Sequence, residues 1–477
     1  MPERDLRGFI DLLSDHGELR VVDGADWELE IGTISELNYE RQGPALLFDN
    51  IKGYPSGYRL VTNAVDTLKK ALVALDFPLD LSLEEASQAL EKKRHDFKPV
   101  PAIEVSEAPI LENAYFGDDV DLLKFPTPRW HDGDGGRYLG TGCSVILRDP
   151  ESSALTMGCY RLMIHDRNTL GLYISPPHLG SIIRKKYWAR GEACPVAVSF
   201  GHDPLMFLAA AANLGKRSVA KDYEFIGHFL NSPMQTVRDE ITGLPIPAMG
   251  EIVVTGEIPP PEEEVRPEGP FGEWTGYYAS GTRDVPVVRV KALYHRDYPI
   301  ILGAPPVKFR HSTSHFGIPH HPLNEVERLR AAGVDDVLDV WRIANPGVMV
   351  VQIRQRYPGH AMKAGLALAG EYMGRFVVVV DEDINPRDSE DVLWAIGTRC
   401  DPETTLTLIK GCQSSALDPR IPPEQKARGD FTTSRAIINA CKPYEWKDQF
   451  PQTNTSTPEL RKATLAKWKH VFNGSTS

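Results

Sequence analysis

The stretch from Glu268 to Tyr278 reads Glu-Gly-Pro-Phe-Gly-Glu-Trp-Thr-Gly-Tyr-Tyr and places two acids, Glu268 and Glu273, five residues apart. Pro270 and its neighbouring glycines argue against a helix, and residues five apart on a regular strand face opposite sides. The spacing predicts a kinked loop or bulge that aims both acids into one cavity. There, repulsion and desolvation raise the pKa of one acid, which leaves a proton donor beside an acceptor. Spacing alone also allows a solvated acidic turn.

Short β-rich runs separated by turns surround this stretch between Tyr138 and about Leu302. Regular spacing of short strands is typical of a barrel, so we expect one here. The runs cover residues 143–147, 170–174, 195–200, 251–254 and 285–290.

The first part of the chain predicts a small α/β module. Apolar residues recur at helical spacing over residues 6–13, Gly17 offers a helix C-cap, and residues 45–48 are typical of a strand. The polar, proline-containing stretch 96–109 predicts a linker to the next domain.

The last part of the chain predicts an α/β unit. Residues 376–380 form a continuous apolar run, as a buried parallel strand does, and helices are expected at 328–332 and 360–373. A final helix starts at Thr457, because a capping residue precedes a proline. Its apolar side is expected to be core or a subunit contact, and comprises Leu460, Leu465, Trp468 and Val471.

A second motif lies earlier in the chain. Residues 156–161 read Thr-Met-Gly-Cys-Tyr-Arg, and His178 follows Arg161 by seventeen positions within Pro-Pro-His-Leu. Together with Glu-Gly-Pro-Phe-Gly-Glu, this ordered set resembles the UbiD family of reversible decarboxylases, which use prenylated flavin mononucleotide (FMN) and a divalent metal. The resemblance covers nearly the whole chain.

The resemblance implies a multidomain fold of the α+β and α/β classes. We expect an N-terminal α/β domain in residues 1–108 and a split β-barrel that binds prenylated FMN in residues 109–305. A C-terminal α/β domain with a terminal helix, used for oligomerisation, is expected in residues 306–477.

By the same resemblance, Arg161 matches the family's catalytic arginine, Glu268 its first acid and Glu273 the acid that exchanges a proton with the reacting carbon. The chemistry is consistent with this match. A guanidinium that stays charged can hold one carboxylate with two hydrogen bonds, while the second acid remains free to be protonated.

The family's metal and flavin phosphate are held by an Asn, a His and a Glu. His178 and Glu224 match the last two, whereas Thr156 stands where the Asn is expected. A Thr hydroxyl is a weaker neutral ligand than an amide oxygen, so coordination of Mn²⁺ or Mg²⁺ is expected to differ. Potassium is a further candidate ion. The cofactor-binding residues implied are Thr156, Met157, Gly158, Cys159, Tyr160, Arg161, Pro177, His178 and Glu224.

Residues 311–321 contain four histidines without the spacing of a helical zinc site. Their place after the barrel predicts a loop at the substrate pocket that includes His315, Ile318 and His320; a surface loop is the other interpretation. Imidazoles in the pocket would favour a hydroxylated or heteroaromatic acid, because a buried polar group rejects substrates that leave it unpaired.

Asp381, Glu382 and Asp383 follow the apolar run 376–380. Ligands gather at the carboxyl ends of parallel strands, so these acids could bind a metal. We favour an acidic junction between strand and loop, since loops are commonly charged.

Composition is that of a cytoplasmic globular protein. The 477 residues are 42% hydrophobic and 25% charged, with a net charge of −12, so nucleic acid is not expected as a partner. The six cysteines form no Cys-x-x-Cys pair, and no apolar run approaches the ~18 residues of a membrane span.

The function expected is reversible, non-oxidative decarboxylation of an aromatic or heteroaromatic acid with release of carbon dioxide. The partners implied are a flavin prenyltransferase and further copies of the chain, as a dimer or hexamer. Three alternatives stay open: a metal-dependent hydrolase that uses His178 and Glu224, a glycosidase that uses the two acids, and a non-catalytic flavin-binding protein.

Overall fold

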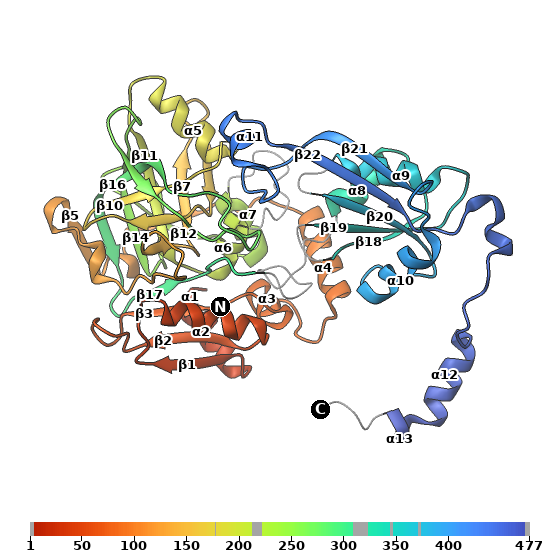
Figure 1. Ribbon diagram of the computed structural model, residues 1–477. Coiled ribbons are helices and arrows are strands. Elements are labelled where there is room, and N and C mark those ends of the chain that lie inside the picture. The colour runs from red at the N-terminus through yellow and green to blue at the C-terminus, as the bar shows by residue number, and fades with distance from the viewer. Residues whose placement is uncertain are drawn as a thin grey trace.

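The computed structural model describes residues 4–176, 178–211, 222–308, 323–343, 347–370 and 374–472. Two lobes are visible in Figure 1, an N-terminal lobe up to residue 308 and a C-terminal lobe that starts at residue 323. Strands of the described ranges form four sheets. No helix in these ranges has the length and apolar character needed to cross a membrane.

The N-terminal module has the predicted helix and strand. Leu6, Phe9, Ile10 and Leu13 are all buried on one side of α1, and Gly17 has a positive φ just after this helix. The sheet order is β1-β2-β3-β17, so β17, at the end of the predicted barrel, instead completes this sheet. The elements are α1 (Leu6–Asp15), β1 (Leu19–Asp23), α2 (Glu30–Glu40), β2 (Ala45–Asp49), β3 (Arg59–Thr62), α3 (Leu68–Leu75), α4 (Leu83–His95) and β17 (Ile300–Leu302).

The central sheet has ten strands in the described residues, eight of them in the order β6-β9-β10-β16-β14-β11-β7-β8. Every predicted β-rich run lies in it, and β16 pairs with β14, β10, β15 and β5. The strands are β5 (Asn113–Phe116), β6 (Tyr138–Gly140), β7 (Ser144–Arg148), β8 (Leu155–Gly158), β9 (Leu162–Ile164), β10 (Thr169–Leu172), β11 (Cys194–Gly201), β14 (Ile252–Ile258), β15 (Val265–Glu268) and β16 (Arg283–His295).

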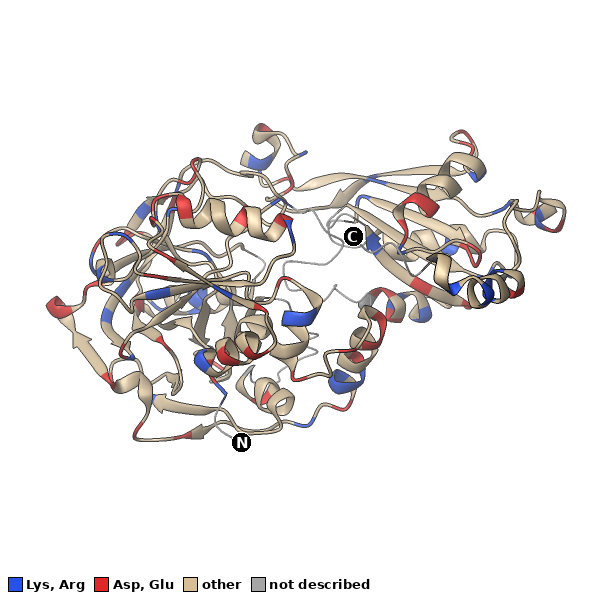
Figure 2. Ribbon diagram, turned by 90° about the horizontal axis from the view of Figure 1, so that it is seen from below, with Lys and Arg blue, Asp and Glu red and all other residues tan. Residues whose placement is uncertain are grey.

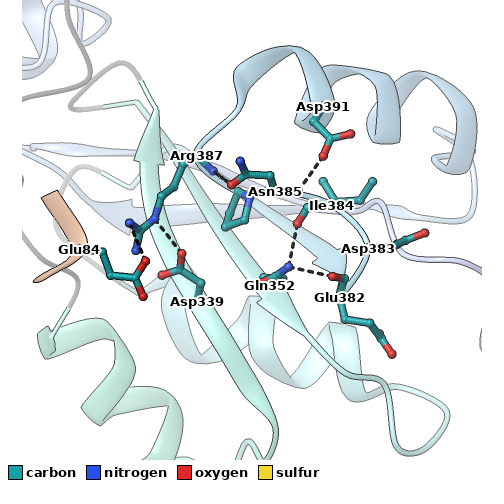
Figure 3. A pocket seen from close by; sticks show the side chains of 10 residues that line it. Glu84, Asp339, Gln352, Glu382, Asp383, Ile384, Asn385, Arg387 and Asp391 are labelled. Atoms are coloured by element: carbon teal, nitrogen blue, oxygen red, sulfur yellow. Dashed lines mark hydrogen bonds and ion pairs between the residues drawn. The ribbon is translucent and has the colours of Figure 1, made fainter. Parts of the chain in front are cut away.

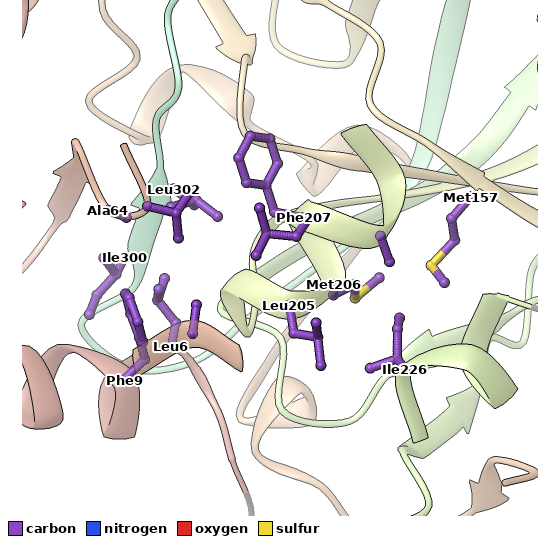
Figure 4. Close-up of a cluster of buried hydrophobic side chains, with 14 of the residues drawn as sticks. Leu6, Phe9, Ala64, Met157, Leu205, Met206, Phe207, Ile226, Ile300 and Leu302 are labelled. Atoms are coloured by element: carbon purple, nitrogen blue, oxygen red, sulfur yellow. The ribbon is translucent and has the colours of Figure 1, made fainter. Parts of the chain in front are cut away.

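Helices α5 (Leu179–Trp188), α6 (Pro204–Ala211) and α7 (Asp222–Leu230) pack against β8. Figure 4 shows side chains of α1, α6 and α7 in one buried cluster with Met157 of β8. Because these side chains are buried together, the cluster fixes the N-terminal module to the central sheet. It also fixes β8, the strand that leads to Arg161.

Short elements connect these parts. The predicted linker 96–109 contains β4, which pairs with β12, so it is partly a strand. The short elements are β4 (Ile103–Glu104), η1 (Pro109–Leu111), η2 (Gly117–Asp119), η3 (Leu122–Lys124), β12 (Gln235–Arg238) and β13 (Pro245–Pro247).

The C-terminal lobe is an α/β unit with the strand order β18-β19-β20-β22-β21. The apolar run forms β20, which lies parallel to both β19 and β22. Helix α9 ends at Ala369, and residues 371–373 lie outside the described ranges. The elements are α8 (Leu323–Ala331), β18 (Val337–Ile343), β19 (Val348–Ile353), α9 (His360–Ala369), β20 (Phe376–Asp381), α10 (Ser389–Arg399), β21 (Leu406–Gln413), α11 (Pro423–Ala427), β22 (Thr432–Asn439) and η4 (Tyr444–Gln449).

The acids after β20 form ion pairs. Arg399 donates to Asp383 over 2.9 and 3.0 Å and lies 3.3 Å from Asp381, while Lys442 lies 2.7 Å from Asp383. Among the described residues, no group of three or more His, Cys, Asp or Glu is placed to hold a metal ion. The structure therefore supports the acidic junction and gives the metal interpretation no support.

The terminal helices α12 (Pro458–Lys467) and α13 (Lys469–Phe472) extend away from the C-terminal lobe (Figure 1). Thr457 caps α12 as predicted, because its side chain accepts a hydrogen bond from Leu460 N over 3.3 Å. The apolar stripe is exposed, with Leu460 at 57% and Trp468 at 45%, so its placement in the core of its own chain is wrong. Periodicity identifies an apolar side but not the surface that covers it.

Acidic and basic residues are interleaved over both lobes (Figure 2). The buried carboxylate of Glu251 joins the N-terminal module to the central sheet through two ion pairs. Arg7 of α1 donates to Glu251 over 2.8 and 2.9 Å, and Arg296 lies 3.3 Å from the same carboxylate, whose side chain is fully buried. Loss of this carboxylate would remove the partner that Arg7 and Arg296 share and, among the described residues, would leave Arg296 with Asp5 alone, at 2.7 Å.

We predict that Glu251→Gln lowers the free energy of unfolding by about 3 kcal/mol, because removal of one member of a buried ion pair is strongly destabilising. Urea unfolding followed by circular dichroism measures this change. Asp26→Asn is the control, since it removes the exposed pair with Lys52 and should cost less than about 1 kcal/mol. Equal losses in the two variants would contradict the prediction.

Candidate active site

The two acids lie on either side of a sharp bend, as the sequence predicts. Glu268 is the last residue of β15, and the chain leaves this strand through Gly269, whose φ is +89°. Glu273 N then donates to Tyr277 O over 3.0 Å, and Gly276 N donates to Glu273 O over 2.8 Å. This turn brings Glu273 back toward the end of the strand.

Arg161, between β8 and β9, joins the two acids. Its Nε donates to Glu268 Oε1 over 2.7 Å and its Nη2 to Glu268 Oε2 over 2.8 Å, which is a bidentate pair. Its Nη1 donates to Glu273 Oε1. All three side chains are buried, so the predicted contacts among these residues are present.

The two acids occupy different environments. Glu268 is fully buried and accepts a further hydrogen bond from Tyr138 Oη over 2.9 Å. Burial raises the pKa of Glu273, with Arg161 and Arg283 opposing this rise and Glu268 adding to it. Glu273 therefore retains its proton to a higher pH than an ordinary glutamate does, which suits a proton donor.

Aromatic rings enclose this network. The Arg161 guanidinium lies 4.7 Å from the centre of the Tyr173 ring and 5.4 Å from that of Phe271. The Phe271 and Tyr138 rings are 4.1 Å apart between centres. These contacts hold the guanidinium and keep water from one side of it.

The other predicted cofactor residues of the first motif lie in β8 or directly after it. Thr156 and Met157 are buried in this strand, and a Cβ on Gly158 would lie 2.4 Å from the Tyr160 ring. Cys159 N donates to Ala210 O over 3.2 Å, which ties this turn to α6. Their roles in flavin binding stay predictions.

The predicted metal ligands lie on elements that touch β8. His178 is the N-cap of α5 and its ring lies 5.7 Å from the Tyr160 ring, edge to face, while Glu224 lies on α7. Helices α5 and α7 both contact β8, which carries Thr156. Coordination by this set stays a prediction. Four of the predicted site residues lie outside the described residues, namely Pro177, His315, Ile318 and His320.

Three residues of the network were not found from the sequence: Tyr138, Tyr173 and Arg283. Arg283 lies directly opposite Glu268 in the antiparallel pair of β15 and β16. Its guanidinium is 4.2 Å from the Tyr173 ring, the same ring that Arg161 contacts. The strand-like run at 285–290 indicated a strand near Arg283. The register between β15 and β16, however, depends on the loop that joins them.

A separate pocket of about 490 Å³ lies in the C-terminal lobe, where Glu84 of α4 approaches it (Figure 3). Arg387 pairs with Asp339 over 2.9 Å and with Glu84 over 3.6 Å at its rim. None of the candidate catalytic residues lines it, and several of its charges are already used in ion pairs.

Three family models match successive parts of the chain. They describe the N-terminal, Rift-related and C-terminal domains of 3-octaprenyl-4-hydroxybenzoate carboxy-lyase, and match residues 10–90, 102–308 and 321–440. The chain belongs to the UbiD family. A phenolic acid decarboxylase of Bacillus subtilis is 30% identical over 93% of both chains. A pyrrole-2-carboxylic acid decarboxylase of Pseudomonas aeruginosa is 30% identical over 98% of this chain and 95% of its own.

Solved UbiD-class structures have the same fold. HmfF from Pelotomaculum thermopropionicum in complex with FMN has a TM-score of 0.81 and 28% identity, over 97% of this chain and 100% of its own. Vanillic acid decarboxylase of Sedimentibacter hydroxybenzoicus in closed form has a TM-score of 0.79 and 27% identity, over 98% and 99%. The chain is thus a UbiD-family carboxy-lyase, and the multidomain α/β character predicted from sequence is confirmed.

We predict that Gly135→Ala impairs this UbiD-family enzyme. Gly135 N donates to Pro270 O over 2.8 Å, and a Cβ on Gly135 would lie only 2.0 Å from Gly269 O. The bend between the two acids must then shift, which costs about 1–3 kcal/mol and misplaces Glu273. Decarboxylation rate and melting temperature measure both effects.

Gly281→Ala is the matched control, because nothing lies within 4 Å of the added Cβ. It should retain near wild-type activity and stability. A Gly135→Ala enzyme as active as Gly281→Ala would show that the bend tolerates displacement.

Proposed function

We propose that this protein catalyses reversible, non-oxidative decarboxylation of an aromatic or heteroaromatic, hydroxylated carboxylic acid with prenylated FMN and a divalent metal. The observation that carries the proposal is the buried network in which Arg161 holds Glu268 and contacts Glu273. The names of the relatives support an aromatic substrate, since they include phenolic acid and pyrrole-2-carboxylic acid decarboxylases.

The chemistry of the donor set fits a hard divalent cation. Thr156 offers a hydroxyl oxygen, His178 an imidazole nitrogen and Glu224 a carboxylate, and such mixed ligands suit Mn²⁺ or Mg²⁺. The residues that would hold the flavin phosphate and this ion are therefore Thr156, His178 and Glu224. Potassium rests on the family resemblance.

Prenylated FMN, when bound, supplies the electron sink that an unassisted aromatic ring lacks. The chain supplies orientation and a proton. Arg161 and Glu268 fix each other, which holds the Arg161 guanidinium where it can orient Glu273. Protonated Glu273 delivers its proton to the ring carbon after carbon dioxide leaves, and as a carboxylate it acts as base in the direction of carboxylation.

The alternatives have less support. A glycosidase or metal-dependent hydrolase needs a carboxylate free to act on water or a sugar, whereas Glu268 is held by both Arg161 and Tyr138. A non-catalytic flavin-binding protein would not need an acid whose pKa is raised by burial beside an arginine.

The proposal also includes the domain bounds, the oligomeric state and the supply of the cofactor. The domains are taken as 1–108, 109–305 and 306–477, with prenylated FMN in the central split barrel. The exposed stripe on α12 and α13 supports a homo-oligomer, and the related HmfF exists in an evolved dimeric form. A cytoplasmic flavin prenyltransferase would supply the cofactor.

The test is to express the protein with a flavin prenyltransferase, record its absorption spectrum and measure carbon dioxide release. The panel comprises 4-hydroxybenzoate, vanillate, 3,4-dihydroxybenzoate, pyrrole-2-carboxylate and cinnamate. Flavin absorbance together with release from a hydroxylated or heterocyclic acid supports the proposal. A colourless protein, or a flavoprotein inactive on the whole panel, would overturn it.

We predict that Glu273→Gln lowers kcat by at least about a hundredfold and leaves flavin absorbance unchanged, since the amide keeps the shape but has no transferable proton. In the wild type, burial raises the pKa of Glu273 above its ordinary value of 4.5. The protonated form is the active one for decarboxylation. The rate should therefore fall as pH rises through this raised pKa, rather than near pH 4.5.

Glu262→Gln, an exposed acid of the same segment, is the control and should leave the pH profile unchanged. A residual Glu273→Gln rate within about tenfold of wild type, a barrier change of only ~1.4 kcal/mol, would remove Glu273 from the role of acid.

We predict that Thr156→Asn strengthens metal retention, because an amide oxygen is a better neutral ligand than a hydroxyl. His178→Ala should release the metal. Metal content after dialysis, measured by mass spectrometry, tests both variants. His95→Ala, which removes an exposed histidine of α4, is the control. Faster metal loss from Thr156→Asn would show that the threonine already suits the site.

A further inference from the structure

The substrate of a decarboxylase carries a carboxylate, and this group needs a cationic partner when it leaves water. Arg161 is already committed to the enzyme's own acids. All three nitrogens of its guanidinium donate to Glu268 or Glu273. A substrate carboxylate at this network would therefore need a second cation.

Arg283 is such a cation. It lies opposite Glu268 across β15 and β16, and its guanidinium is 4.2 Å from the Tyr173 ring, while that of Arg161 is 4.7 Å from the same ring. The positive charge of Arg283 is also close enough to lower the pKa of Glu273. Arg283 and Arg161 therefore both border the reacting acid.

The guanidinium of Arg283 has a hydrogen-bond donor without a partner among the described residues. Its Nη2 donates to Ser280 Oγ, but its Nε is buried and has no hydrogen-bond partner within the described part of the chain. Over these same residues, no carboxylate lies within ion-pair distance of it. Buried donors in native proteins usually have a partner, so the open Nε of Arg283 is a donor that a ligand beside Glu273 could use.

A third cation, Lys426, approaches this site from the C-terminal lobe. Lys426 of α11 donates from Nζ to Ala279 O over 3.0 Å, beside the Ser280 that Arg283 contacts. The charge of Lys426 interacts with both Arg283 and Glu273. Arg283 from the N-terminal lobe and Lys426 from the C-terminal lobe therefore both act on Glu273. One carboxyl group does not neutralise two cations.

We propose that Arg283 binds the carboxylate of the substrate and that Lys426 adds positive charge to the same site. This inference rests on the proposed function and extends it with a specificity-determining residue. A guanidinium suits the role, because it stays charged and can grip a carboxylate with two parallel hydrogen bonds. The carboxylate charge moves away from this site as carbon dioxide leaves. Arg283 therefore contributes mainly to substrate binding.

The test compares Arg283→Gln and Arg283→Lys with wild type. The probes are 4-hydroxybenzoate and pyrrole-2-carboxylate, together with their decarboxylated products phenol and pyrrole. Calorimetry gives Kd for each compound, and carbon dioxide release gives KM and kcat. Arg289→Gln is the matched control, since Arg289 lies on the same strand but pairs with Glu264 over 2.7 Å.

For Arg283→Gln we expect Kd and KM for the acids to rise at least about tenfold, or ~1.4 kcal/mol, because a hydrogen bond between two charged groups is lost. Product Kd should stay within about threefold, and kcat should change less than kcat/KM does. Arg283→Lys should give intermediate Kd values for the acids, and Arg289→Gln wild-type values.

Acid Kd values within about twofold of wild type in both Arg283 variants would overturn the inference. So would an equal weakening of acids and products, because that pattern indicates general damage to the pocket. Arg283-dependent binding without carbon dioxide release would support Arg283 while overturning the decarboxylase proposal. A wild-type protein that binds neither acid would overturn both.

Discussion

The bidentate ion pair between Arg161 and Glu268 is the interaction on which the arrangement of the site depends. Both groups are buried, where an unpaired charge is strongly unfavourable, so each requires the other. The pair connects the turn after β8 with the end of β15, two segments more than a hundred residues apart in sequence. Glu273 can approach this pair as a third member only because the chain bends at Gly269.

The larger architecture supports this network from two directions. The shared apolar cluster of α1, α6 and α7 fixes β8 from one side. From the other, β16 extends over thirteen residues and pairs with β15, so it positions both Glu268 and Arg283. Because a one-residue slip reverses which face a strand side chain occupies, the register of this pair determines whether Arg283 shares the Tyr173 ring with Arg161.

Much of the fold could be predicted from residue patterns, whereas the contact of Arg161 with the two acids was expected from the family resemblance. Apolar periodicity located α1 and a continuous apolar run located β20, while the Gly and Pro between the acids predicted the bend. Arg283 was missed because cross-strand pairing depends on how residues 269–282 return, which no local pattern specifies. Leu460 and its neighbours show a related limit, since periodicity does not say which chain covers an apolar side.

The geometry of metal coordination by Thr156, His178 and Glu224 could not be predicted from residue patterns either. Their proposed roles rest on the family resemblance. Ligand geometry depends on side-chain directions from three separate elements, β8, α5 and α7, whose packing the sequence does not specify. By contrast, an acidic junction at Asp381 and Asp383 could be predicted from the sequence, because charged loops after buried strands are common, although their ion pairs with Arg399 were not predicted.

The position of Lys426 has a consequence for motion between the lobes. Polar contacts that join them include Lys426 with Ala279 and Arg387 with Glu84, and interfaces of this kind permit relative movement. Lys426 and Arg283 repel each other, which weakens this contact between the lobes. An anion bound between them would cancel that repulsion. A bound acid would thus strengthen the contact of α11 with Ala279, and formation of neutral carbon dioxide would weaken it again.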